Sequence, residues 1–311
     1  MKYVFFLLIP GMLFIYTCKQ EAETDPSNPF LSAWKTPFET PPFDQIKNEH
    51  FLPAFTEGFN QQNNVIIAIL SNGEEATFDN TILPLDKSGD LLSKVKNVFF
   101  NLESANTDDE KQAIAREIAP MLSAHNDDIT MNEELFNRIN AVYEKRNSSG
   151  LDHSQVRVVE KYYEMFVRNG ANLSPEDKNK LREMNEELTG LSVKFGQNLL
   201  AETNDSFRMV IENKDDLASL TDNAITGAAE AAREAGLDGK WLFTLHKPSW
   251  IPFLQFSDKR DLREKIYRGW FMRGNNNNEY DNKYILKRIA ELRALRAALL
   301  GYKDHATYQI E

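Results

Sequence analysis

The five histidines are the side chains of this 311-residue chain whose chemistry is easiest to read from spacing, because imidazoles are common zinc ligands. A catalytic zinc helix reads H-E-x-x-H, which places two imidazoles one turn apart with a glutamate between them to activate a metal-bound water. The residues that follow the histidines are Phe51, Asn126, Ser154, Lys247 and Ala306. None of them is glutamate, so no histidine of this chain opens the motif.

Other reactive or metal-binding patterns are equally absent from the sequence. No serine, cysteine or threonine lies in a recognisable nucleophile motif, and no glycine-rich phosphate loop occurs. The run Thr107 to Glu110 is interpreted as a capping box that opens a helix rather than as a cation site. Asp127 and Asp128 beside His125 could bind a metal, but their spacing at a predicted helix junction favours capping or solvation. We therefore assign no catalytic and no metal-binding residue to this chain.

Two aromatic segments are candidates for contact with a ligand. Residues His246 to Phe253, which include Trp250 and two prolines, leave a predicted strand as a stiff loop that could line a peptide-binding groove. The alternative is a buried strand exit held by Trp250 and Phe253. Arg268 lies on a predicted helix crowded with rings and arginines, a surface that can anchor partners. The alternative there is a helix that packs its rings inward and solvates its guanidinium groups.

Helical signals dominate the elements that must position these residues. The clearest helix begins at Ser174-Pro175-Glu176-Asp177, with a serine cap, a proline in the first turn and acidic neighbours, and its apolar stripe continues to Leu199. Further helices are predicted at about 45–70, 88–103, 107–122, 132–146, 152–169, 215–235, 258–273 and 280–300. Residues 207–211 and 241–245 alternate and could pair as one small ribbon. The predicted fold class is mainly α, a multi-helix lobe with at most this β ribbon.

The N-terminal residues are interpreted as a targeting segment. Lys2 precedes an uncharged apolar run from Tyr3 to Tyr16, which is too short to span a bilayer comfortably and is followed by a polar stretch. Residues 1–17 are therefore predicted to be a signal peptide and residues 18–27 a polar tether. Cys18, the only cysteine, directly follows the run, as in bacterial lipoprotein signals, and is the predicted lipidation site; the alternative is a signal peptide with an incidental cysteine.

A proline-studded strap follows the tether over residues 26–44. Its five prolines preclude a regular helix. Its aromatic residues are predicted to pin it onto the body of the protein, because disordered tails carry few aromatics. These residues are Phe30, Trp34, Phe38 and Phe43.

Ordered sequence matches connect the chain to a known family. The run Asn28 to Phe55, which begins N-P-F-L-S-A-W-K-T-P-F-E-T-P-P-F, resembles the start of bacterial peptidyl-dipeptidases. These belong to the thimet oligopeptidase-like zinc metallopeptidases, peptidase family M3. Further similar segments are Thr77 to Ile82, Val98 to Leu102, Ser104 to Thr107 and Leu299 to Lys303. The resemblance covers residues 28–311, which are interpreted as the helical N-terminal region of such a peptidase.

The resemblance implies an almost wholly helical, two-lobed protein whose deep channel admits short unfolded peptides. In the family, two histidines of the H-E-x-x-H helix and a later glutamate hold zinc, and the glutamate of the motif is the general base. We expect those positions to lie beyond Glu311, so the chain alone is predicted to bind no zinc and to be inactive. Residues 28–311 are expected to form one wall of the channel. His246, Trp250, Phe253 and Arg268 are assigned to its peptide-facing surface.

The expected partners are short unfolded peptides and, through Cys18, a membrane of a bacterial cell envelope. A net charge of −11 without a basic stripe argues against nucleic acid. The full-length peptidase, a peptidyl-dipeptidase or an oligopeptidase, is expected to be an exported monomer. The alternative function is a membrane-tethered, non-enzymatic helical module that binds peptides.

Overall fold

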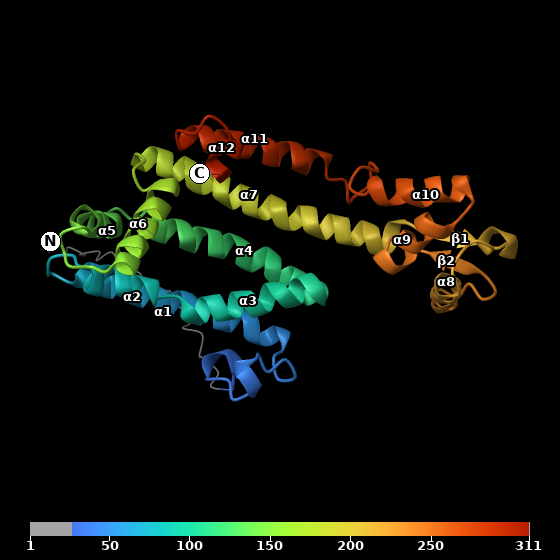
Figure 1. The fold of residues 1–311 in the computed structure, drawn as a ribbon, viewed down its shortest axis with the longest axis horizontal. Helices are drawn as coiled ribbons and strands as arrows, with labels where there is room; N and C mark the ends of the chain where they lie inside the picture. Colours follow the sequence, from blue (N-terminus) through green and yellow to red (C-terminus); the bar gives the residue numbers. More distant parts are fainter. Residues whose placement is uncertain (1–26, 311) are drawn as a thin grey trace, which may run out of the picture.

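The computed structural model describes residues 27–310, and helices make up most of them (Figure 1). The α-helices are α1 (Phe51–Ser71), α2 (Leu83–Asp86), α3 (Asp90–Ala105), α4 (Asp109–Thr130), α5 (Glu133–Lys145), α6 (His153–Arg168), α7 (Pro175–Ala201), α8 (Asp222–Glu234), α9 (Lys247–Phe256), α10 (Arg260–Phe271), α11 (Lys283–Leu299) and α12 (His305–Ile310). Across residues 27–310, none of the helices combines the length and the apolar character needed to cross a bilayer. The predicted signal peptide and Cys18 lie outside the described residues.

The long helix α7 organises the molecule. It runs along the long axis between α4 on one side and α11 on the other, and it packs against both (Figure 1). Helices α1 to α6 gather toward the end where α7 begins, whereas α8, α9, α10 and the two strands lie at the end where it finishes (Figure 1). Helix α7 therefore connects two groups of elements that are distant in space.

The start and the packing of α7 confirm the sequence prediction. Ser174 caps the helix by accepting a hydrogen bond from the backbone N–H of Asp177 at 3.2 Å. Its apolar stripe, which includes the buried Leu188, packs against Ile285, Ile289 and Leu292 of α11. A second core lies between the strap, α1, α3 and α4, and a third between α1, α5 and α6. The apolar spacing read from the sequence thus identifies the faces along which the long helices meet.

The predicted ribbon is present. Strands β1 (Met209–Ile211) and β2 (Trp241–Phe243) pair antiparallel, with Val210 opposite Leu242. Met209 and Phe243 are buried under α8, α9 and α10 in a further core. This small sheet fixes the position at which the chain enters α9.

Two sequence interpretations of the middle of the chain are wrong. Residues after β2 form the helix α9 rather than a loop, because Pro248 lies in its first turn, where a backbone N–H is not needed. Helix α4 continues to Thr130, so Asp127 lies inside it rather than at a junction. Asp127 is only 2% exposed, so it is neither a cap nor a solvated carboxylate.

Two details at the N-terminal side are also wrong. The cap of α4 is Asp108, which accepts the Lys111 N–H at 2.8 Å, and not Thr107. In the strap, Phe30 is buried against Phe51, but Phe38 is 99% exposed and Phe43 is more than half exposed. The first part of the strap is therefore pinned as predicted, and the later aromatic residues are not.

Candidate functional site

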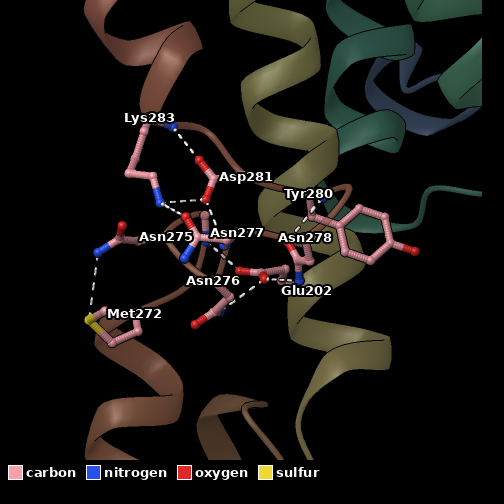
Figure 2. Close-up of polar contacts among 10 residues, drawn as sticks. Glu202, Met272, Asn275, Asn276, Asn277, Asn278, Tyr280, Asp281 and Lys283 are labelled. Atoms are coloured by element: carbon pink, nitrogen blue, oxygen red, sulfur yellow. Dashed lines mark hydrogen bonds and ion pairs between the residues drawn. The ribbon is translucent and has the colours of Figure 1, made fainter.

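Glu202 is a buried carboxylate at the point where α7 passes into a π-helical turn, η5 (Glu202–Ser206). Only 1% of this residue is exposed. Figure 2 shows the side-chain amides of Asn276 and Asn278 converging on it, at 2.9 and 2.6 Å from Oε1. The backbone N–H of Gly274 is a third donor, to Oε2. Buried carboxylates must be paired or hydrogen-bonded, and here the donors come from the segment between α10 and α11. Glu202 therefore ties that segment to the end of α7.

The segment, residues 272–282, is here called the asparagine loop. Gly274 and Asn277 both adopt positive φ, 73° and 53°, a conformation that glycine and asparagine tolerate better than other residues. Asp281 accepts hydrogen bonds from the backbone N–H groups of Asn277 and Lys283, at 2.8 and 3.0 Å (Figure 2). The Lys283 ammonium and these N–H groups hold the pKa of Asp281 below its usual value. These bonds fix the loop in the shape that presents its amides to Glu202.

Asn282 attaches the far end of the same loop to α7. Its side-chain oxygen accepts a hydrogen bond from Asn198 at 2.9 Å, and its amide donates to the Phe195 carbonyl at 3.1 Å. Asn282 is buried, so each of these polar groups needs its partner. The asparagine loop is thus fastened to α7 at two levels, by Asn282 and by Glu202.

A cavity of about 340 Å³ opens beside Glu202. Its lining includes the cationic side chains of Lys265, Arg268 and Arg273, and the only carboxylate among its lining residues is Glu202, whose oxygens already accept hydrogen bonds. Burial lowers the pKa of Arg273, an effect that the nearby Glu202 carboxylate opposes. Arg268 already pairs through Nε with Glu264 at 2.8 Å, outside the lining. The remaining guanidinium N–H groups and the Lys265 ammonium leave the cavity able to attract carbonyl or carboxylate oxygens.

The wall formed by α10 depends on a glycine. A Cβ at Gly269 would lie 2.5 Å from Cε2 of Phe207, closer than any ordinary contact. Arg273 lies one turn further along, with its guanidinium carbon 3.4 Å from the centre of the Trp270 ring and Nη1 donating to Thr203 at 2.6 Å. The close approach at Gly269 therefore brings α10 against Phe207, the residue that follows η5, at the wall of the cavity.

Of the four residues assigned from sequence to a peptide-facing surface, the structure places Arg268 in the wall of this cavity. His246 is exposed nearby, and its Nε2 lies 3.1 Å from the Asn204 side chain of η5. Trp250 stacks on Trp270 with ring centres 4.4 Å apart, and Phe253 is fully buried against β2. Peptide contact by any of the four remains a prediction.

Sequence reasoning missed Glu202, the central residue of the site. The available signal is the run of four asparagines from Asn275 to Asn278, which lies between the predicted helices 258–273 and 280–300 and by itself indicates only a loop. Four adjacent carboxamides supply more donors than a short turn uses, so an acceptor elsewhere in the chain was to be expected. The sequence does not say which acidic residue that is.

The described residues do not fit a zinc site. Within residues 27–310, no group of three or more histidine, cysteine, aspartate or glutamate side chains is placed to hold a metal ion. Glu202 itself is surrounded by N–H donors rather than by further ligands. A tetrahedral zinc site needs several nitrogen, sulfur or oxygen ligands converging on one point.

Comparisons with known proteins agree with the resemblance found in the sequence. The sequence profile of Peptidase family M3 matches residues 253–311, the segment that contains α10, the asparagine loop and α11. Dipeptidyl carboxypeptidase from Escherichia coli (strain K12) is 41% identical over 283 residues, which are 91% of this chain and 41% of that protein. The dipeptidyl carboxypeptidase of Salmonella typhimurium is 36% identical over 284 residues, 91% of this chain and 42% of that protein.

A more distant relative has a different name. Oligopeptidase A from Haemophilus influenzae is 30% identical over 283 residues, 90% of this chain and 40% of that protein. The similarity therefore runs along almost the whole of this chain in each case. The chain spans about two fifths of the length of the curated relatives that it matches.

Proposed function

Because this chain belongs to peptidase family M3, we propose that it is the N-terminal, peptide-facing part of an exported zinc metallopeptidase that hydrolyses short peptides. Its activity would be that of a peptidyl-dipeptidase or an oligopeptidase, the two kinds of activity named among its relatives. The observation that carries this proposal is the identity with bacterial dipeptidyl carboxypeptidases along almost the entire chain. The mainly helical fold agrees with it.

We propose further that this chain supplies no zinc ligand. Peptidases of family M3 are zinc metallopeptidases, but no histidine here opens H-E-x-x-H. The metal ligands and the general base would then come from sequence that this chain does not include. Incubation of the purified chain with zinc and a short peptide is expected to give no cleavage above background. Turnover that a chelator abolishes would contradict this part of the proposal.

The contribution of the chain would be to hold the peptide. The cavity beside Glu202 supports this role, because Lys265, Arg268 and Arg273 can donate charge-assisted hydrogen bonds to peptide oxygens. We expect the Arg268→Ala variant to bind a fluorescent pentapeptide about tenfold more weakly, measured by anisotropy. Arg182→Ala is the matched control, since Arg182 lies on the first half of α7 and pairs with Asp128 at 3.3 Å. If both variants and the parent chain bind the peptide with equal affinity, the cavity beside Glu202 does not contribute to peptide binding.

The envelope location is a proposal that depends on Cys18. A lipid attached to this cysteine would anchor the protein to a membrane surface. Labelling of expressing bacterial cells with a radioactive fatty acid is expected to mark the natural chain but not the Cys18→Ser variant. A signal that persists in the variant, or that is absent from both, would contradict the lipid anchor.

A further inference from the structure

A second cavity lies on the other half of α7, away from the asparagine loop. It has a volume of about 410 Å³ and is lined by α4, α7 and α11, the three helices that run side by side in Figure 1. Its walls are unusually polar for a gap between packed helices. Asp127 comes from α4, Asn185 from α7, and Arg293 and Arg296 from α11.

The acidic wall has an incompletely satisfied carboxylate. Asp127 is 2% exposed; Nδ2 of Asn185 lies 2.9 and 3.1 Å from its two oxygens, and the side chain of Asn126 also bonds to it. An ionised carboxylate can accept about four hydrogen bonds. Arg182, the basic residue on the facing part of α7, bonds to the neighbouring Asp128 instead. Asp127 therefore retains acceptor capacity toward the cavity.

The basic wall has unused donors. Among the ion pairs found within residues 27–310, none involves Arg293 or Arg296. The Nε of Arg296 is buried without a hydrogen-bond partner, and Nη1 donates to Oδ1 of Asn185 at 3.3 Å. A buried N–H without a partner is costly, and it leaves the Arg296 guanidinium with donor capacity that its protein neighbours do not use.

The two walls are held a short distance apart by one side chain. Asn185 donates to Asp127 with its amide nitrogen and accepts from Arg296 with its amide oxygen, so a single carboxamide separates the negative from the positive group. A ligand that satisfies both walls must carry a cation and an anion at a comparable separation. The ends of a dipeptide are at most about 7 Å apart, and those of a free amino acid are closer.

We propose that this cavity binds a small zwitterion, a free amino acid or a dipeptide, with its ammonium group on Asp127 and its carboxylate on Arg293 and Arg296. A metal ion fits less well, because Asp127 is the only carboxylate in the lining. A simple anion fits less well too, because Asp127 would repel it. The proposal stands on this cavity alone and does not depend on peptidase activity.

The first test uses the unaltered chain and four probes in isothermal titration calorimetry. L-alanine and L-alanyl-L-alanine represent the two sources of the zwitterion, and the tighter binder identifies the source. N-acetyl-L-alanyl-L-alanine removes the ammonium group, and L-alanyl-L-alaninamide removes the carboxylate. Each capped probe is expected to bind at least about tenfold more weakly than the free dipeptide. No saturable heat from either free probe at millimolar concentration, or equal binding of the capped probes, would overturn the proposal.

The second test assigns the two ends of the ligand to the two walls. Asp127→Asn keeps the shape of the side chain and is expected to weaken the binding of the free probe at least about tenfold, with a smaller effect on the acetylated probe. Asp128→Asn is the matched control, because Asp128 is exposed and already paired with Arg182. Arg296→Gln should selectively weaken probes that carry a carboxylate. Loss of affinity in the Asp128 variant equal to that in the Asp127 variant would contradict the assignment.

Discussion

Replacement of Glu202 by alanine is the sharpest structural perturbation of the candidate site. The substitution removes the acceptor for three donors, but these donors differ in what happens next. Asn276 and Asn278 are exposed, so their amides can turn to water at little cost. The N–H of Gly274 is buried, and a buried donor without a partner costs about 1–3 kcal/mol. With the lost packing of one methylene, about 0.8 kcal/mol, the expected destabilisation is about 3 kcal/mol.

The effect should be local, because Glu202 joins the asparagine loop to α7 and does not touch the strap or α1. Hydrogen exchange followed by mass spectrometry measures opening of each segment separately, which is appropriate for a chain with several distinct cores. We expect the free energy of opening to fall by about 3 kcal/mol in peptides covering residues 272–286. Peptides covering residues 51–105 should exchange as in the parent chain.

Two further variants define the outcome that would refute this reasoning. Asn276→Ala removes one exposed donor and should cost no more than about 1 kcal/mol in the same peptides. Glu202→Gln retains one acceptor oxygen and should fall between the two. An alanine variant at Glu202 that exchanges like the parent chain, or no faster than the Asn276 variant, would show that the carboxylate does not hold the loop.

Two other substitutions test the packing and the charges of α7 and its neighbours. Burial raises the pKa of Asp127 to about 6, above its value in the unfolded chain. The folded state therefore binds a proton at Asp127 more tightly than the unfolded state does. Because of this difference, the free energy of unfolding should fall by at most about 3 kcal/mol as the pH rises from about 4 through 6. Urea titrations across this range should show a smaller decrease for Asp127→Asn, and an unchanged slope would contradict burial as the cause. Gly269→Ala should lower the stability by about 1–3 kcal/mol, because the new methyl group meets the Phe207 ring. The matched control is Gly196→Ala on α7, where no atom lies within 4 Å; this helix-favouring change should raise the melting temperature, and a similar fall in both variants would rule out the ring contact as the reason.

The long helices could be predicted because their signals are local. Ser174 with Pro175 marks the start of α7, and the spacing of its apolar residues identifies the face that packs on α11. The two short strands were also predictable from alternation, since one face of each is buried. In these regions the local sequence signals agree with the tertiary packing that the structure shows.

Helix α9 could not be predicted in the same way. Pro248 and Pro252 both suggest a break, yet the first lies in the initial turn, where it costs nothing. The gain that offsets Pro252 is tertiary: Phe253 is buried against Phe243, and Trp250 stacks on Trp270. Such contacts involve elements that are separate in sequence, and propensity alone does not contain them.

The candidate site was even less accessible to sequence reasoning. Glu202 and Asn276 are far apart along the chain and meet only because α11 returns along α7. The position of Asp127 near a predicted helix junction favours capping or solvation, whereas α7 buries its carboxylate. In both cases the helix partner decides the role of the carboxylate.

The central claim, that this chain is the peptide-facing part of a zinc peptidase, is tested most directly by joining it to the region of a relative that it does not match. The chain would be fused to the part of Escherichia coli dipeptidyl carboxypeptidase that it does not match, and cleavage of a short peptide would be measured with zinc and with a chelator. We predict zinc-dependent release of short products that is lost when the chelator is added. The Arg268→Ala variant of the fusion protein should have a higher KM for the peptide. A folded fusion protein that binds zinc and peptide without cleaving would contradict the claim and favour a peptide-binding module.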